Sequence, residues 1–503
     1  MVGAAVAAFA LVSVVPLAYM IAMWIGALGR ETSAYRDLFL DSRQRELLFN
    51  TAGLGAGTAL AATAIGVPLG IALARMALPF KAGLRILLAA PALLPSYVVG
   101  LAWLSLGESV WMRSLPVAVA VLSVALYPLS MVMTEAAVRG IEPRLEEAAA
   151  LVAVPGRVLW RITLPLIMPS VLAAALVVFV LAISDFGVPA VLRVRVFTTE
   201  IFTAFAALYD FARATALAVP LLLLSLLVAS VSVRLAGDRL VASRRGGAGE
   251  PQTLDRWRGA AVGMITGVVL AALVLPITIL AVEARQVSSW RTVVAGSGDA
   301  IGYSVTLATV GATLVCGLGL CLGYARARAE RGVAVAADVV CIVLFAVPAT
   351  IVGVALIGLW NRQGVAGAIY ATHGMFLLVY LARFTPLAAL ALATSVRRVP
   401  SSQEEAASVS GAGWFQTMTQ IVLPQVKLGC LAVWVVVFTL AFGELGASVL
   451  VTPPGESTLP IRIYTLIANA PPAQVAVLAL LQIAVIFTPL ALLGCGLAMR
   501  RRS

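Results

Sequence analysis

Apolar residues in this chain are gathered into long runs that short polar stretches separate. About 20 mostly apolar residues in an α-helix span the roughly 30 Å hydrocarbon core of a bilayer. Twelve runs reach that length, so the pattern predicts an all-α polytopic membrane protein of about twelve transmembrane helices. They cover approximately residues 2–28, 49–74, 86–107, 115–138, 166–190, 214–233, 259–282, 301–325, 333–360, 365–395, 425–451 and 472–498.

The composition supports this interpretation. Of the 503 residues, 61% are apolar and 12% are charged, whereas about 25% of the residues of an ordinary soluble domain are charged. So few charges cannot cover the surfaces of the several soluble domains that this length would otherwise form. The same composition excludes a disordered chain, a collagen and a disulfide scaffold. The first run lacks a basic start and is too long for a signal peptide, so we interpret it as a retained span.

The basic residues indicate the orientation of the spans. The net charge is +12, but the basic residues are distributed among the loops. With the N-terminus inside, 22 of the 35 Lys and Arg fall in inside loops, 12 fall in outside loops, and Arg383 lies within a span. This asymmetry is the one expected of a membrane protein. We therefore expect both termini in the cytoplasm, and no nucleic-acid partner.

The two halves of the chain resemble each other. Residues 66–75 (GVPLGIALAR) match residues 319–328 (GLCLGYARAR) at an offset of 253. Both copies contain G-x-x-x-G, beginning at Gly66 and Gly319, a pattern that lets helices approach closely. With six spans in each half, matching segments run in the same direction, which predicts a parallel 6+6 repeat with a pathway between the halves.

The longest polar stretch between runs divides the chain almost in half. We expect a first six-span unit over residues 1–235, a cytoplasmic linker over 236–258, and a second six-span unit over 259–503.

Few residues in the chain are suited to catalysis or metal binding. His373 is the single histidine, and no Cys pair accompanies it, so we expect a core or pore-lining residue and no metal site. The five Cys lie in apolar stretches, where they act as small hydrophobic residues. The phosphate-binding pattern G-x-x-x-x-G-K-[ST] is also absent from the sequence, so we expect no ATP or Mg²⁺ site in this chain.

Two cytoplasmic segments, residues 142–170 and 399–427, are too polar to remain in lipid. Each begins with a predicted short helix rich in Glu and Ala, with acidic residues in its first turn, where the helix dipole favours them. A break of small residues follows, at 153–156 or 410–413, and allows a sharp turn. An amphipathic piece then ends in Leu-Pro, where we expect a new helix to begin.

The second segment resembles the cytoplasmic signature of ATP-binding-cassette importer permeases: Glu-Ala-Ala, three residues, Gly, nine residues and Ile-x-Leu-Pro. The first copy has Ala153 in place of Gly, and Glu147 is 18 residues from Pro165 where the second copy has 19. The resemblance implies that each segment forms a coupling helix that contacts a cytoplasmic ATPase. The candidate residues are Glu146, Glu147, Ala148, Ala149, Ala153, Gly156, Leu164 and Pro165 in the first segment, and Glu404, Glu405, Ala406, Ala407, Gly411, Ile421, Leu423 and Pro424 in the second.

Residues 184–192 (SDFGVPAVL) and 443–464 (GELGASVLVTPPGESTLPIRIY) are similar to segments of fused two-unit permeases of the ferric-iron uptake type, and thiamine permeases have a similar layout. This resemblance implies a multi-pass protein of the bacterial inner membrane that forms the pathway for ferric iron. It also implies two kinds of partner, a cytoplasmic ATPase dimer that binds ATP and Mg²⁺ and an extracytoplasmic substrate-binding protein. The chain itself would catalyse no reaction.

Asp185 and Glu444 occupy equivalent positions, 259 residues apart, after the fifth and eleventh spans. They could approach each other across the pathway and attract a cation or bind the docked binding protein. They could equally be interfacial acids, since the 17 residues from Met168 to Asp185 extend about 26 Å as a helix and end close to water. Both interpretations stay open at this point.

Two alternatives to a ferric-iron importer follow from the sequence. An importer of the same architecture could carry thiamine, a polyamine, sulfate or phosphonate. A twelve-span ion-coupled carrier could also consist of two six-span halves. Such carriers usually have charged signatures between spans two and three, where this chain has only Arg75, Lys81 and Arg85 and no acid.

Overall fold

The computed structural model describes residues 2–28, 42–107, 109–151, 153–236 and 255–500, and in these ranges it contains helices and no strands. Ten helices of this part of the chain are long and apolar enough to cross a membrane, and two pairs of helices bent at a break raise the number of possible spans to twelve. The prediction of an all-α polytopic protein is therefore confirmed.

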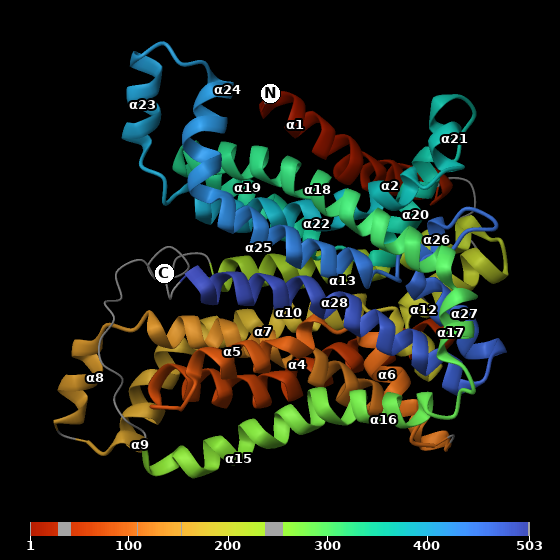
Figure 1. Cartoon of the computed structure of the whole chain (residues 1–503). Helices are drawn as coiled ribbons and strands as arrows, with labels where there is room; N and C mark the ends of the chain where they lie inside the picture. The colour runs from red at the N-terminus through yellow and green to blue at the C-terminus, as the bar shows by residue number, and fades with distance from the viewer. Residues whose placement is uncertain (1, 29–41, 108, 152, 237–254, 501–503) are drawn as a thin grey trace.

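The helices of the two halves follow each other in a similar order (Figure 1). Those of the first half are α1 (Val2–Phe9), η1 (Ala10–Val14), α2 (Val15–Leu28), α4 (Ser42–Arg75), α5 (Lys81–Ala89), η2 (Ala90–Leu93), α6 (Ser96–Leu104), η3 (Val110–Arg113), α7 (Leu115–Arg139), α8 (Pro143–Ala150), α9 (Pro155–Val158), η4 (Leu159–Thr163), α10 (Leu164–Ser184), α11 (Gly187–Leu192), α12 (Phe197–Phe202), η5 (Thr203–Ala207) and α13 (Phe211–Ala236). Those of the second half are η6 (Asp255–Trp257), α15 (Arg258–Val269), η7 (Leu270–Val274), α16 (Leu275–Ala284), α17 (Trp290–Ala295), α18 (Gly298–Arg328), α19 (Arg331–Phe345), α20 (Ala349–Trp360), α21 (Val365–Tyr370), α22 (Gly374–Val396), α23 (Ser401–Val409), α24 (Trp414–Thr417), η8 (Met418–Val422), α25 (Leu423–Phe442), α26 (Ser448–Val451), α27 (Leu459–Asn469) and α28 (Pro472–Arg500).

The third and ninth predicted spans are bent rather than straight. The helix over 81–93 meets α6 at 81°, and α19 meets α20 at 94°. Pro95 and Pro348 immediately precede the second helix of each pair and have extended backbone angles. Proline fixes its own φ and disfavours a helical conformation in the residue before it, which explains a bend at the same place in both halves.

Four spans contain a π-helical turn that ends two residues before a proline. The turns are η1, η4, η7 and η8, and the prolines are Pro16, Pro165, Pro276 and Pro424. A proline has no N–H to donate, and a wider turn accommodates it without ending the helix. Helices α10 and α25 begin at the predicted Leu-Pro pairs, but η4 and η8 join them without a break to α9 and α24. The continuous helices begin 11 residues before the predicted spans, at Pro155 and Trp414.

The first span of each half packs against the opposite half. Helix α1 contacts α18 and α22, and α2 contacts α20; in return α15 contacts α4 and α5, and α16 contacts α6. Figure 1 shows α1 and α2 along the second-half helices and α15 along the first-half helices. The two units of the sequence are thus interlocked in space.

The G-x-x-x-G pairs lie where two helices touch through their backbones. A Cβ on Gly70 would come within 2.6 Å of the Met131 carbonyl oxygen of α7, and one on Gly323 within 2.8 Å of the Ala389 carbonyl oxygen of α22. Such distances leave no room for a side chain, so these glycines set the spacing of the α4–α7 and α18–α22 pairs.

Candidate functional site

The two predicted coupling segments lie at the same end of the molecule, one in each unit (Figure 1). Helices α8 and α9 form the first segment, and α23 and α24 form the second. Both stand beyond the ends of the long helices, as a parallel repeat requires of equivalent loops. The ends of α6, α20 and α27 lie at the opposite side of the molecule.

An arginine at the C-terminal end of α4 holds the first segment in place. Arg75 Nη2 lies 2.7 Å from Glu146 Oε2 and also donates to the Val138 carbonyl oxygen at 2.8 Å. The other carboxylate oxygen of Glu146 accepts a bond from the Thr163 hydroxyl at 2.7 Å. Glu146 is buried, with 5% of its surface exposed. This clamp ties the coupling helix α8 both to a membrane span and to η4, the beginning of the next one.

The second segment has an equivalent clamp. Arg328, 253 residues after Arg75, donates from Nε to Glu404 at 3.0 Å, pairs with the same carboxylate through Nη2, and donates to the Val399 carbonyl oxygen at 2.9 Å. Tyr324 replaces the threonine as the hydroxyl donor, at 2.7 Å from Glu404. Arg75 and Arg328 are the last residues of the repeated segments 66–75 and 319–328, and this match is the sequence signal that could have predicted the clamps.

The glutamate that directly follows the anchored one in each segment faces solvent. Glu147 and Glu405 are exposed, and so are Ala148 and Ala406. Among the described contacts neither carboxylate has a partner within the chain. Ala149 and Ala407 are half-buried against the protein. Each Glu-Glu pair thus has an inner acid that anchors the helix and an outer acid that is available to a partner.

The break after the coupling helix differs between the two segments. Gly411 has φ +80°, a left-handed conformation that favours glycine, and the Ala412 N–H donates to the Ala407 carbonyl oxygen at 3.0 Å. This geometry is that of a glycine ending a helix. Ala153 occupies the matching place without a positive φ, and its N–H continues the helical pattern to Ala149. The missing glycine therefore gives the first segment a different turn.

The other candidate residues lie on the helix that leads back into the membrane. Gly156 is in α9, and Leu164 and Pro165 begin α10. Ile421 is in η8, and Leu423 and Pro424 begin α25. Pro165, Leu423 and Pro424 are exposed, whereas Gly156, Leu164 and Ile421 are half-buried.

Asp185 and Glu444 each end a long helix and cap a short one. Asp185 Oδ1 accepts the Val188 N–H at 2.8 Å, and Oδ2 accepts the Ser96 hydroxyl at 2.5 Å. Glu444 accepts the N–H groups of Ala447 and Ser448 at 3.0 and 2.8 Å. Both acids satisfy backbone donors at the start of a short helix, a role that the sequence analysis did not consider.

Glu444 also forms an ion pair with Arg383 of α22, with 2.7 Å between Oε1 and Nη1. Its side chain is 1% exposed, so for Glu444 the expectation of an interfacial acid close to water is wrong. Arg383 lies nine residues after Gly374, the first residue of α22, or about 14 Å along the helix. Each acid contacts its own unit, and none of the described contacts joins Asp185 to Glu444.

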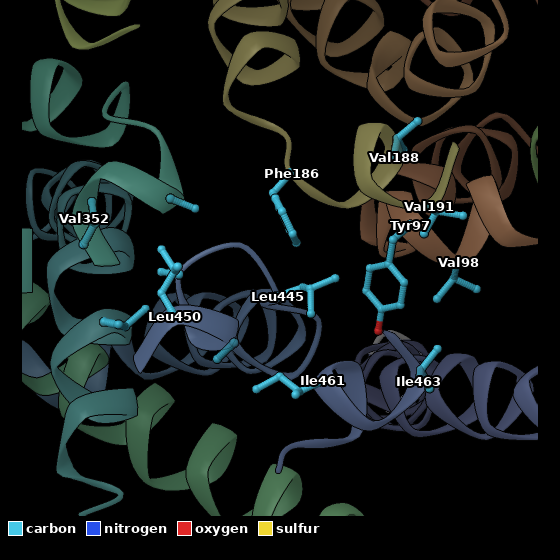
Figure 2. Close-up of a cluster of buried hydrophobic side chains, with 14 of the residues drawn as sticks. Tyr97, Val98, Phe186, Val188, Val191, Val352, Leu445, Leu450, Ile461 and Ile463 are labelled. Atoms are coloured by element: carbon cyan, nitrogen blue, oxygen red, sulfur yellow. The ribbon is translucent and has the colours of Figure 1, made fainter. Parts of the chain in front are cut away.

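Apolar side chains close the space between the two units near these caps. Figure 2 shows Phe186 at the centre, with Leu445 and Leu450 of the second unit facing it. Phe186 is 2% exposed and Leu445 is 4% exposed. A Cβ on Gly446 would lie 3.4 Å from the Phe186 side chain, so the residues after the two acids meet at the boundary between the units. We call this the apolar constriction.

The family model described as "Binding-protein-dependent transport system inner membrane component" matches the chain twice, over residues 66–241 and 316–497. The chain belongs to this family. It is a multi-pass inner-membrane permease, with one copy of the family domain in each half.

Curated relatives include permeases for several cargoes. A protein named "Fe(3+)-transport system permease protein FbpB 2", from Haemophilus influenzae, is 22% identical over 442 residues, which are 85% of each chain. A putative ferric transport permease of the same organism is 25% identical over 68% of this chain and 56% of its own length. The Escherichia coli putrescine permease PotI is 29% identical over 33% of this chain and 60% of its own length.

The single histidine of the permease is partly exposed rather than buried in the core. His373 precedes α22, and its Nε2 lies 2.5 Å from Glu456 Oε2, while its ring packs 4.7 Å from the ring of Tyr303. About a third of the His373 side chain is exposed. No group of three or more potential metal ligands occurs among the described residues. The expectation of a core histidine is therefore wrong, and a pore-lining position stays a prediction.

Proposed function

We propose that this permease is the translocation subunit of an ATP-driven importer, and that the two clamped segments are its coupling helices. The observation that carries the proposal is the duplicated arrangement of an anchored glutamate beside an exposed one, on the same side of both units. A helix fixed at its inner face can transmit a displacement into the span that continues from it. The exposed Glu147 and Glu405 would bind basic side chains of a partner.

The partner that fits is a cytoplasmic ATPase dimer, which would supply the ATP and Mg²⁺ sites. Closure of the dimer would move the two segments and, through η4 and η8, the spans that follow. An extracytoplasmic substrate-binding protein would deliver the cargo to the opposite face. The division into units at residues 1–235 and 259–503, with a linker over 236–258, belongs to this proposal, as does a cytoplasmic position for both termini. The linker lies mostly outside the described residues.

Ferric iron is the cargo that we propose. The supporting observation is the relative named as a ferric permease, which aligns over 85% of both chains. A polyamine is the second candidate, since the putrescine permease is 29% identical over a shorter segment.

The proposal is tested by purifying the tagged permease in mild detergent together with its ATPase. We expect an ATPase to co-purify with the wild type and to be lost from the double variant Glu405→Lys, Gly411→Ala. Uptake of radioactive iron into vesicles that contain the whole complex, with putrescine as a competitor, then tests the cargo. A permease that transports without any ATPase would contradict the proposal and favour an ion-coupled carrier.

A further inference from the structure

A cavity of about 250 Å³ lies at the boundary between the units, beside the apolar constriction. Phe186 and Phe202 of the first unit and Tyr464 of the second line it, and their rings form a cluster with centroid distances of 5.1 to 6.1 Å. The volume of the cavity is well above the roughly 10–15 Å³ that one water molecule needs by the same measure. It is large enough for a small organic anion or for a metal ion with its ligands.

The repeat places the aromatic cluster at one side of this cavity close to the axis that relates the units. The Phe197 N–H donates to Thr51, and the Leu459 N–H donates to Ser304, 253 residues after Thr51. Phe202 and Tyr464 each follow these N–H groups by five residues, so they are equivalent. Equivalent rings that touch each other, at 6.1 Å between centroids, must lie on either side of the axis. The two units therefore meet at this aromatic cluster, beside the cavity.

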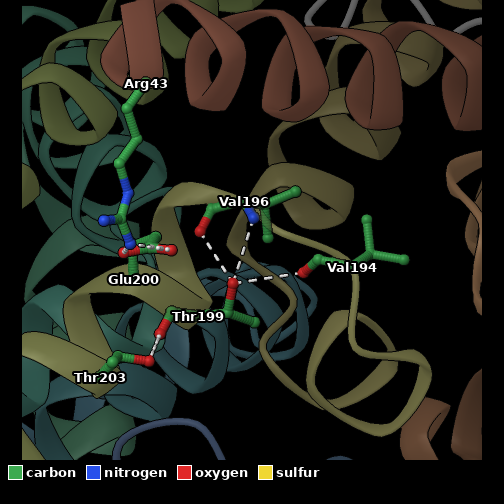
Figure 3. Close-up of polar contacts among 6 residues, drawn as sticks. All are labelled: Arg43, Val194, Val196, Thr199, Glu200 and Thr203. Atoms are coloured by element: carbon green, nitrogen blue, oxygen red, sulfur yellow. Dashed lines mark hydrogen bonds and ion pairs between the residues drawn. The ribbon is translucent and has the colours of Figure 1, made fainter. Parts of the chain in front are cut away.

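The charged residues of the cavity come from one unit only. Arg193 and Arg195 line it and are exposed, and in the described part of the chain neither guanidinium is within ion-pair distance of an acid. The acid in the lining, Glu200, is already paired with Arg43 of α4 at 3.0 Å (Figure 3). The nearby hydroxyls are also engaged, because Thr199 donates to Val194 and Val196. The lining thus includes two arginines that have no acidic partner among the described residues.

The backbone at Arg193 adds to this argument. Arg193 ends α11 with φ +56°, a left-handed conformation that costs roughly 1 kcal/mol or more for a residue other than glycine. Glycine would adopt this backbone conformation at a lower conformational energy, yet a residue with a long cationic side chain occupies the position. Guanidinium groups bind carboxylates and phosphates through paired hydrogen bonds, and they repel a bare metal cation.

We propose that this cavity is an oxyanion site on the pathway, so that the cargo passes as a complex with net negative charge or exposed carboxylate or phosphate oxygens. The inference rests on the proposed importer function and narrows its cargo class. A ferric ion would enter with its oxyanion ligands, and Arg193 and Arg195 would bind those ligands just before the apolar constriction.

The first experiment measures anion binding to the purified permease in nanodiscs by calorimetry. The probes are citrate and inorganic phosphate, with spermidine as a cationic control. We expect Arg193→Gln and Arg195→Gln each to weaken citrate binding about tenfold, the effect of losing roughly 1.4 kcal/mol per charged contact. Arg285→Gln, which changes an exposed arginine that does not line the cavity, should have no effect. Equal citrate affinity of all variants, or preferential binding of spermidine, would overturn the proposal.

The second experiment measures iron uptake by proteoliposomes that contain the whole complex, with iron supplied as ferric citrate. The variant that combines Arg193→Gln with Arg195→Gln should take up iron at least tenfold more slowly and still associate normally with the binding protein. Loss of that association with intact citrate binding would show that the arginines contact the binding protein instead, and would overturn the proposal. If the wild type imports no iron but binds citrate through the arginines, the iron assignment fails and the oxyanion site stands.

Discussion

Replacement of Glu404 by glutamine should release the second coupling helix from the membrane span. Glu404 accepts two bonds from Arg328 and one from Tyr324. Glutamine keeps the shape but loses the charge, and a charge-assisted bond is worth about 1 kcal/mol more than a neutral one. The two arginine bonds therefore account for about 2 kcal/mol. The Arg328 side chain is 23% exposed, so solvent screening does not remove most of this value.

A loss of about 2 kcal/mol shifts the equilibrium between the clamped and released loop roughly 30-fold. Hydrogen–deuterium exchange of the α23 amides measures it directly, because released helices exchange in proportion to their open population. We expect protection to fall about 30-fold in Glu404→Gln, and transport per ATP hydrolysed to fall with it.

Glu405→Gln is the matched control for this experiment. The neighbouring carboxylate is exposed and has no described partner in the chain, so its amide should leave exchange unchanged and weaken only the association with the ATPase. Unchanged exchange in Glu404→Gln would refute the clamp as the element that holds the loop. Faster exchange in Glu405→Gln would refute the division of roles between the two acids.

Three further predictions follow from the same geometry. Charge reversal at Glu405 should uncouple transport from ATP hydrolysis more than charge reversal at Glu147, since only the second segment has the complete signature; equal transport by the two variants at equal membrane levels would contradict this. Gly323→Ala should lower the thermal stability in detergent by about 1–3 kcal/mol, the usual cost of overpacking, whereas Gly317→Ala on the same helix, which has open space at its Cβ position, should leave it equal or higher. Arg383→Met should leave the buried Glu444 carboxylate without its cation and lower the stability by several kcal/mol, and a double variant with Glu444→Gln should recover part of that loss; if the double variant is no more stable than Arg383→Met, the two residues are not coupled.

The sequence predicted the type of the spans, and also their number if each bent pair counts as one span, because lipid imposes a simple length rule on apolar helices. It also predicted the repeat, since matching glycines and prolines solve the same packing and bending problems in both halves. It predicted span boundaries poorly at Pro165 and Pro424. Proline normally ends or begins a helix, and only the π-helical turns before these residues let the helices continue.

The candidate site was predicted in part. The signature located both segments but did not distinguish the anchored acid from the exposed one, because Glu404 and Glu405 are chemically identical until Arg328 selects between them. The capping role of Asp185 depends on the short helix that follows it, and the ion pair of Glu444 depends on the packing of α22 beside the end of α25. Hydropathy contains no information on such contacts. Arg383 was visible as a charge within a span, but its partner lies 61 residues away.

The interlocked first spans have a consequence for biogenesis. Helix α2 ends at Leu28, but α20, against which it packs, ends at Trp360. At about 5–20 residues per second, the roughly 330 residues between them take about 15–65 s to synthesise. During that interval the first span waits in the bilayer with its packing face turned to lipid or to the insertion machinery. A ribosome that pauses in the second half prolongs this exposure, so the packing of the earliest helix depends on a part of the message about 330 residues further on.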